Sequence, residues 1–202
     1  TTSADMESVS SLNALRNRSR ALIRDNPHAK RAQTVVADNV IGMGIGMQGS
    51  LQNNRGRLVT DANDAIERAW DDWCDADACH IGGTLHFADL ERLLLCEVFA
   101  AGDVFIRIHR SGRGAVPLSL EVIEAERLAD EWEAPSLNGN LVRQGVECDA
   151  YNRPVAYWMH EYHPGDPRRP MVQDRIIRVL AEDIIHLRTL DRWPQVRGDR
   201  KS

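Results

Sequence analysis

Aromatic residues are scarce in this chain, and long apolar runs are absent. Phe, Trp and Tyr together make up 5% of the 202 residues, and the longest apolar run, around Leu93-Leu94-Leu95-Cys96, ends at Glu97. A transmembrane helix needs about 20 consecutive apolar residues, and no apolar segment typical of a signal peptide follows the N-terminus. The sequence therefore predicts a soluble chain with no membrane partner.

Two common catalytic motifs are also missing. No Gly-Lys-Ser/Thr occurs, which excludes a P-loop, and no Gly-x-Ser-x-Gly marks a hydrolase nucleophile. His160, His163 and Asp166 could serve acid–base chemistry. Without a nucleophile at a recognisable turn, an ordinary surface hairpin is the favoured interpretation, and a hydrolase that uses one of these histidines is a remote alternative.

The glycine series Gly42-x-Gly44-x-Gly46 is the one candidate for nucleotide binding. A dinucleotide fingerprint needs a strand before its glycines and a helix after them, so that the pyrophosphate meets a helix N-terminus. Here a predicted helix precedes the glycines and a loop follows. We interpret the series as a flexible exit from a helix.

Metal binding is weakly indicated. Cys74 and Cys79 barely fit the Cys-x2–4-Cys spacing of a zinc site, which needs a second close pair, and Cys96 and Cys148 lie in a predicted helix and a predicted strand. Asp75 and Asp77 lack the further oxygen ligands of a calcium loop. Free, partly buried thiols and a solvated turn are the expectation, with no metal and no cofactor. The residues considered are Cys74, Cys79, Cys96, Cys148, His80 and His86.

Charge is unevenly distributed along the chain. The net charge is −5, yet residues 61–103 hold eleven Asp or Glu against only Arg68 and Arg92. An acidic average argues weakly against a surface that grips nucleic acid, and the carboxylates around Trp70 and Trp73 argue against base stacking there. The basic N-terminal stretch carries Arg16, Arg18, Arg20, Arg24, Lys30 and Arg31. Such polarity suits a subunit with different neighbours on different faces, although solvated helix faces also produce it.

The hydrophobic periodicity changes once, near residue 101. Before it, helical spacing predicts helices at about 11–25, 26–42, 61–73 and 84–100, with Ser11, Asn26 and Asp61 as N-caps and residues 84–87 opening the last. After it, a period of two predicts strands at 104–110, 118–123, 142–148, 155–162 and 176–180, with 149–154 as a hairpin connection. Helices followed by strands indicate an α+β fold with a mostly antiparallel sheet.

Several motifs in one order resemble lambda-type tailed-phage portal proteins. A tryptophan pair, a Cys-Asp-Ala-Asp turn and a helix lead to Gly102-Asp103-Val104-Phe105-Ile106-Arg107. Asn152 departs from the pattern, because it stands where the family commonly has Gly. The resemblance extends over about residues 11–198 through segments 19–32, 38–45, 70–77, 85–90, 102–110, 145–157, 184–187 and 192–198.

The resemblance implies a structural, non-enzymatic subunit of the portal ring at one capsid vertex. Residues 1–10, which are small and polar, are expected to be disordered. The resemblance implies a wing-type domain at 11–198 (helical 11–100, β-rich 101–190) and a tail at 199–202 leading toward absent stem, clip and crown regions. It further implies about a dozen sister subunits, terminase, capsid and head–tail connector partners, and double-stranded DNA that passes without tight binding. Localisation would be the virion, and the host cytoplasm during assembly. The alternative is a small prophage-encoded regulator that binds metal or nucleic acid.

Overall fold

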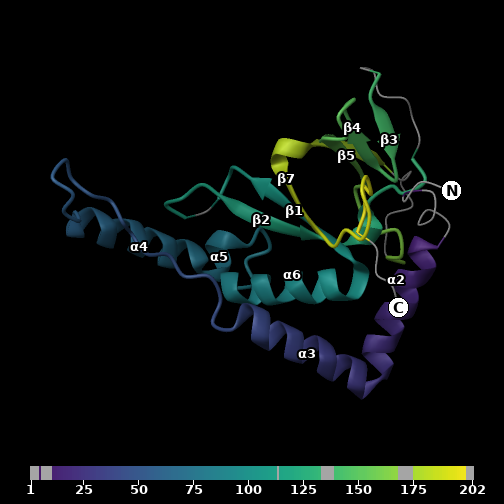
Figure 1. Ribbon diagram of the computed structural model, residues 1–202, viewed down its shortest axis with the longest axis horizontal. Helices are drawn as coiled ribbons and strands as arrows, with labels where there is room; N and C mark the ends of the chain where they lie inside the picture. Colours follow the sequence, from purple (N-terminus) through teal and green to yellow (C-terminus); the bar gives the residue numbers. More distant parts are fainter. Residues whose placement is uncertain (1–4, 6–10, 113, 133–138, 168–174, 199–202) are drawn as a thin grey trace. The chain divides into compact units, whose positions relative to one another are not determined.

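The computed structural model describes residue 5 and residues 11–112, 114–132, 139–167 and 175–198 (Figure 1). Helices occupy the first half of the chain, and strands with two short 3-10 turns occupy the second. The helices are α2 (Leu12–Asp25), α3 (Pro27–Ile41), α4 (Thr60–Cys74), α5 (Ala76–Cys79) and α6 (Phe87–Ala101). The later elements are β1 (Asp103–His109), β2 (Ser119–Ile123), η1 (Ala125–Arg127), β3 (Leu141–Arg143), β4 (Val146–Cys148), β5 (Pro154–His160), β6 (Ile176–Leu180), η2 (Ala181–Asp183) and β7 (Ile184–Arg188).

The strands form two sheets. One has the order β2-β1-β7 and the other β3-β4-β5-β6. The pairs β1–β7, β3–β4, β4–β5 and β5–β6 are antiparallel, and Phe105 lies opposite His186. The α+β class with antiparallel strands is thus confirmed, while the strands divide between two sheets.

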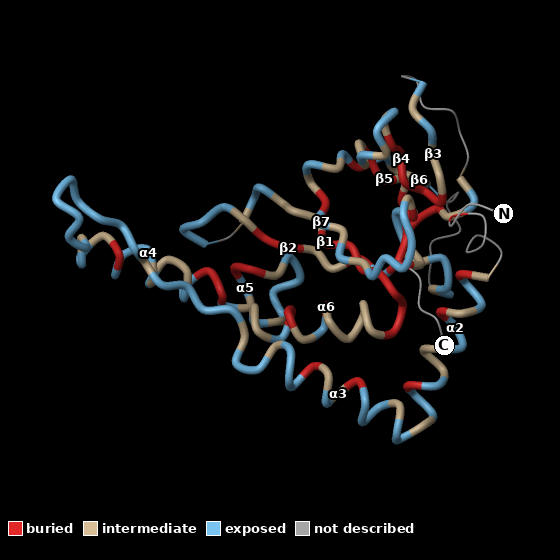
Figure 2. Tube along the Cα trace, viewed as in Figure 1, coloured by how far each residue is buried: buried red, intermediate tan, exposed pale blue. Residues whose placement is uncertain are grey.

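The chain separates into two compact units. The first comprises residues 1–34, 96–107 and 122–202, and the second comprises residues 35–95 and 108–121. Strands β1, β4 and β5 contain consecutive buried residues (Figure 2). Burial of apolar side chains is the main force that holds such a unit together. The core of the first unit is formed by Phe105, Ile123, Leu128, Val146, Cys148, Tyr157, Met159, Val179, Ile184 and Val196.

The predicted tryptophan pair lies in the second unit as packing. Trp70, Trp73 and Phe87 form a cluster with ring centroids 5.1–5.4 Å apart. The Trp73 indole N–H donates to the Leu118 carbonyl at 2.8 Å, which satisfies its one polar group. Aromatic side chains in this arrangement stabilise a core by area and by ring contacts.

The predicted strand at 142–148 is wrong, because two strands, β3 and β4, replace it. Gln144 and Gly145 have φ of 50° and 77°. Two consecutive positive φ values reverse the chain in a two-residue hairpin. The alternating pattern on both sides of this turn hid it, because Gln is not a residue that favours positive φ.

Two predicted caps are also wrong, and one is confirmed. Asn26 Oδ1 accepts hydrogen bonds from the N–H groups of His28 (2.9 Å) and Ala29 (3.3 Å), as an N-cap side chain does. Ser11 makes no side-chain cap bond, and Val59 precedes α4 where Asp61 had been expected to cap it. Helix α6 begins at Phe87, within the predicted opening at residues 84–87.

Candidate functional site

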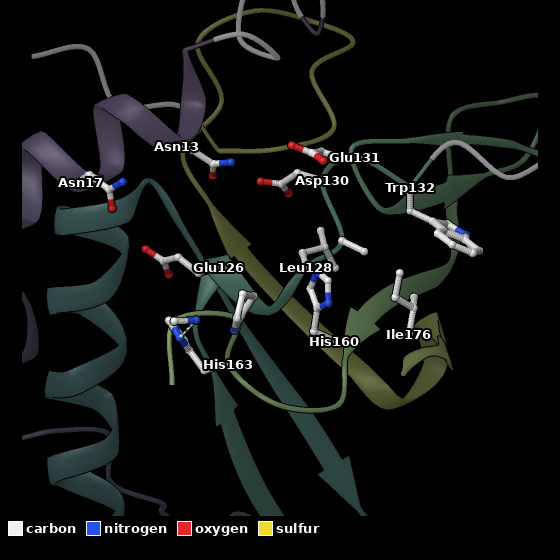
Figure 3. Close-up of a pocket in the computed structure, with 13 residues that line it drawn as sticks. Asn13, Asn17, Glu126, Leu128, Asp130, Glu131, Trp132, His160, His163 and Ile176 are labelled. Carbon is white, nitrogen blue, oxygen red and sulfur yellow. Dashed lines mark hydrogen bonds between the residues drawn. The ribbon is translucent and has the colours of Figure 1, made fainter. Parts of the chain in front are cut away.

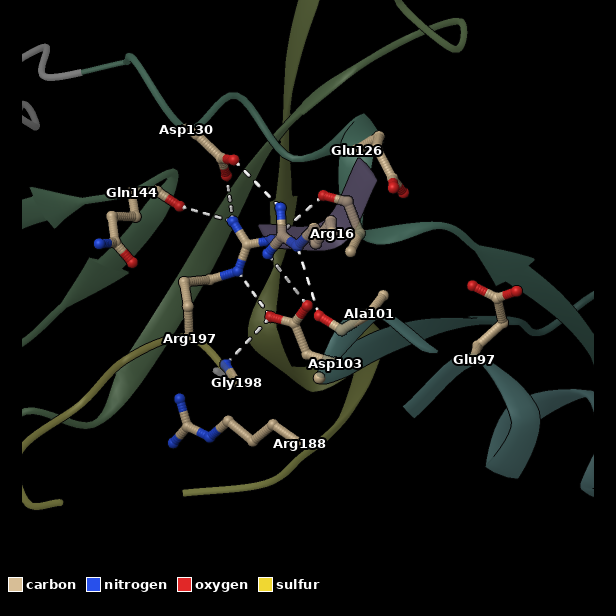
Figure 4. A network of polar contacts seen from close by, with 12 residues as sticks. Arg16, Glu97, Ala101, Asp103, Glu126, Asp130, Gln144, Arg188, Arg197 and Gly198 are labelled. Carbon is tan, nitrogen blue, oxygen red and sulfur yellow. Dashed lines mark hydrogen bonds and ion pairs between the residues drawn. The ribbon is translucent and has the colours of Figure 1, made fainter. Parts of the chain in front are cut away.

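Strand β1 begins with Asp103, whose carboxylate is fully buried. Asp103 follows Gly102, whose φ of 87° lets the chain leave α6 and turn into the strand. Asp103 Oδ2 accepts hydrogen bonds from Arg197 Nε at 2.7 Å and from the Gly198 backbone N–H at 3.2 Å (Figure 4). Asp103 Oδ1 accepts one from Arg16 Nη2 at 3.2 Å. Two guanidinium groups therefore balance this buried charge.

Arg197 is also fully buried, and each side of its guanidinium has a partner. It pairs with Asp130 and donates to the carbonyls of Gln144 (3.2 Å) and Ala125 (3.1 Å). Arg16 completes the group by pairing with Asp130 at 3.2 Å. Two arginines and two carboxylates from α2, the start of β1, the segment after η1 and the C-terminal segment thus form a neutral cluster, which we call the buried ion network.

The electrostatics fit a structural role. Burial alone would raise the pKa of Asp103, but the charges of Arg197 and Arg16 and a hydrogen bond from His186 hold it well below its usual range. Burial works against the charge of Arg197, yet Asp103 and Asp130 raise its pKa above the usual value. Burial and the neighbouring Arg197 lower the pKa of Arg16. The carboxylate of Asp103 therefore stays ionised and tightly held.

His186 extends the network into the core. Its Nε2 lies 3.3 Å from Asp103 Oδ2 and its Nδ1 lies 3.4 Å from the Tyr157 hydroxyl. Since an ionised carboxylate only accepts, Nε2 carries the proton and Nδ1 accepts from tyrosine. The Phe105 ring stacks on the imidazole with centroids 4.2 Å apart. A Tyr–His–Asp series could move protons, but the His186 side chain is 5% exposed, so a substrate has no access to it.

We expect this histidine to make the protein less stable as the pH falls from about 6.5 to about 4. Burial lowers the pKa of His186 to about 4, although the Asp103 contact opposes that shift. In the unfolded chain the imidazole takes up a proton near pH 6.5, so the unfolded state binds more protons across this range and gains stability as the pH falls. The loss amounts to about 3 kcal/mol in total.

Urea unfolding at a series of pH values tests this expectation against a His186→Gln variant. Glutamine can donate to Asp103 and accept from Tyr157 but does not titrate. The difference in unfolding free energy between wild type and variant should shrink or invert as the pH falls. A difference that is constant between pH 7 and pH 4 would contradict the assignment.

Two further charged clusters join residues of the sequence motifs in the first unit. Arg20 bridges Glu97 at 2.8 Å and Glu126 at 2.9 Å. Glu147, which is fully buried, accepts hydrogen bonds from Arg178 at 2.8 Å and 3.0 Å. The motif segments at 102–110 and 192–198 thus pair with each other, whereas segment 19–32 pairs with α6 and η1 and segment 145–157 pairs with β6.

The first unit contains a surface cavity of about 610 Å³ (Figure 3). His160 and His163 line it, so the structure brings together two of the three residues considered for acid–base chemistry. His163 Nε2 lies 3.4 Å from Glu124 and its Nδ1 accepts from the Gly165 N–H. Asp166 is not among the lining residues. The others are Asn13, Asn17, Glu126, Leu128, Ala129, Asp130, Glu131, Trp132, Pro164, Gly165 and Ile176, and among them Ser, Thr and Cys, the usual nucleophiles, do not occur.

The glycine series does not form a phosphate site. Gly44 has a φ of 87°, and a side chain there would come within 2.7 Å of Glu91. The Ile45 N–H donates to this same carboxylate at 3.1 Å. A negative charge at the glycines, with no helix beginning behind them, repels phosphate instead of binding it.

The cysteines and their neighbours do not converge. Cys79 Sγ donates to the carbonyls of Cys74 and Leu85, and burial raises the pKa of this thiol to about 11. The His80 ring contacts Thr84, and the Asp75 carbonyl accepts the first hydrogen bonds of α5. Over the described ranges, no three His, Cys, Asp or Glu side chains are placed to hold one metal ion. None of the four cysteines, all within the described part of the chain, forms a disulfide.

Sequence reasoning missed the members of the buried ion network as partners. Asp103 and Arg197 are 94 positions apart, and nothing local connects them. Strand β7 was also missed, because His186 occupies an inward-facing position where alternation would call for an apolar residue. The motifs themselves held the one clue, because a charged residue at a fixed place in an otherwise apolar segment often belongs to a buried ion pair.

Comparisons with known proteins agree with this architecture. A family profile described as "Phage portal protein, lambda family" matches residues 1–199. A protein described as "Probable portal protein", from Halomonas phage phiHAP-1, is 30% identical over 180 residues, which cover 89% of this chain and 34% of that protein. This chain therefore spans about a third of that relative's length.

Solved structures share the fold. The neck of an empty gene transfer agent particle contains a chain with a TM-score of 0.51 and 15% identity, covering 89% of this chain and 39% of that one. The virion of a native gene transfer agent particle contains one with a TM-score of 0.52 and 16% identity, covering 89% and 38%. With the match over residues 1–199, this chain belongs to the lambda family of phage portal proteins.

Proposed function

We propose that this chain is part of a structural subunit of a phage portal ring, through which double-stranded DNA enters and leaves the capsid. The observation that carries the proposal is the match of the portal family profile to residues 1–199. The site chemistry supports it, because the buried ion network ties distant segments together and its Asp103 and Arg197 are closed to solvent. No enzymatic activity is proposed.

The proposal extends to domain and partners. Residues 11–198 would form the wing-type part of the subunit, and sister subunits would surround it in a closed ring of about a dozen copies. Terminase, capsid and head–tail connector proteins would contact the full-length protein. The virion is its proposed location, with the host cytoplasm during assembly. Across the described residues, no helix combines the length and apolarity needed to cross a bilayer.

Weak contact with DNA is part of the same proposal. A net charge of −5 disfavours strong attraction to the phosphates of DNA. Weak attraction suits a channel, because duplex DNA that is bound tightly could not move through it. The alternative, a metal- or nucleic-acid-binding regulator, gains no support from the cysteine and histidine positions or from the family match.

Electron microscopy of the full gene product tests the proposal. Purified protein should form rings with a central hole. In a gel-shift assay across salt concentrations, the chain should bind duplex weakly. A tight complex whose affinity falls steeply with salt, together with particles that lack a hole, would contradict the proposal.

A further inference from the structure

The second unit carries an arm made of an extended segment laid along a helix. We define the arm as residues 43–74, which comprise the extended stretch 43–51, the turn 52–59 and α4 (Figure 1). The backbone of the extended stretch bonds to α4 through Leu51 and Asn63 (2.8 Å) and through Gly49 and Glu67 (2.8 Å). The stretch is therefore fixed in place, and its outward side chains form a defined surface.

That surface is apolar and uncovered. Six large apolar side chains of the arm are exposed, and Met43 is fully so. Large apolar side chains exposed along one segment of a protein often mark an interaction surface. The six are Met43, Ile45, Met47, Leu51, Leu58 and Ile66.

The same arm is strongly acidic. Helix α4 exposes Asp61, Asp64, Asp71 and Asp72 at spacings that place them on neighbouring faces. Of the ion pairs found among the described residues, none involves these four carboxylates. Arg68 is the one basic residue within the helix. A partner surface must therefore be basic as well as apolar.

Helices α2 and α3 present that complementary combination. Arg18 and Leu22 are exposed one helical turn apart on α2, and Arg31 and Val35 repeat this spacing on α3. Arg18 and Arg31 belong to no ion pair within the described part of the chain, and the Lys30 ammonium group donates to the Gln33 side-chain oxygen at 3.1 Å. Each helix thus offers a cation beside an apolar side chain.

We propose that the arm of one copy of this chain packs against the exposed faces of α2 and α3 of a second copy. The inference rests on the proposed function, because a ring closes only when each copy has two different, complementary surfaces. The carboxylates of α4 would face Arg18 and Arg31, while the apolar side chains of the arm would cover Leu22 and Val35. Charge fixes the orientation of such a contact, and apolar burial holds it.

Sedimentation of the purified chain over a range of concentrations tests this contact. The wild type should associate, more strongly at about 0.05 M than at about 0.5 M salt, since salt screens exposed charges. Asp64→Lys with Asp71→Lys should weaken association at low salt by about tenfold or more, and so should Arg18→Glu with Arg31→Glu. The fourfold variant that carries both reversals should return to within about threefold of wild type.

Glu161→Lys, a reversal of an exposed charge outside these helices, should leave association unchanged. Circular dichroism must show that every variant keeps its helices. A chain that stays monomeric at all concentrations, reversals without effect, or a fourfold variant without recovery would each overturn the contact. Rings of the full gene product that form equally well with the reversals would overturn this contact alone, whereas absence of rings in the wild type would overturn the proposed function.

Discussion

Replacement of Arg197 by methionine is expected to lower the free energy of unfolding by about 3–5 kcal/mol. The side chain is fully buried and balances Asp103, which is also fully buried, at 2.7 Å. Its removal leaves Arg16 as the one cation paired with that carboxylate among the described residues, and it takes a charged donor away from the carbonyls of Ala125 and Gln144. Urea unfolding followed by circular dichroism measures the loss.

Arg153→Met is the matched control for this substitution. Arg153 is exposed, and its guanidinium lies 5.7 Å from the ring of Tyr151. Exposed contacts of this kind contribute about 0.5–1 kcal/mol. If Arg197→Met costs no more than this control, the buried ion network does not hold the first unit together.

Phe105→Ala is expected to cost about 3–5 kcal/mol of unfolding free energy. Phe105 is fully buried, stacks on His186, and contacts the Tyr157 ring edge-on at 5.5 Å. The Arg197 guanidinium lies over the same ring at 5.4 Å. The substitution therefore opens a cavity in the core and also removes the ring that packs against Arg197 and His186.

Tyr151→Ala provides the comparison, because this aromatic side chain is 78% exposed. Its loss should change the unfolding free energy by about 1 kcal/mol or less. Equal losses for the two variants in urea unfolding would show that the motif phenylalanine is not a core residue.

The hydrophobic periodicity predicted the helices well. α2, α3, α4 and α6 lie where apolar residues recur at helical spacing, because that spacing reports the side buried against a core. Their beginnings were less certain. A cap depends on whether one side chain reaches a free N–H, and only Asn26 does so among the three that were expected.

The strands were predicted less completely, for two physical reasons. Alternation continues across a tight turn, so the hairpin at Gln144 and Gly145 looked like one strand. In β7 an inward position is polar, since His186 bonds to Asp103. A period-two pattern cannot report a polar side chain whose partner lies far away in the chain.

The candidate site was the least predictable part. The sequence placed Asp103 at the start of a strand and Arg197 in a C-terminal motif, but their pairing depends on the folded path of the chain. By contrast, the arguments against a phosphate site and a zinc site were local. The structure adds that Glu91 lies beside Gly44 and that the Cys79 thiol donates to backbone carbonyls.

Native mass spectrometry of the full gene product tests the central claim most directly, because it counts copies in an assembly. The account predicts one discrete closed assembly of about a dozen subunits. A monomer or dimer across the accessible concentrations, or a ladder of masses with no preferred number, would contradict it.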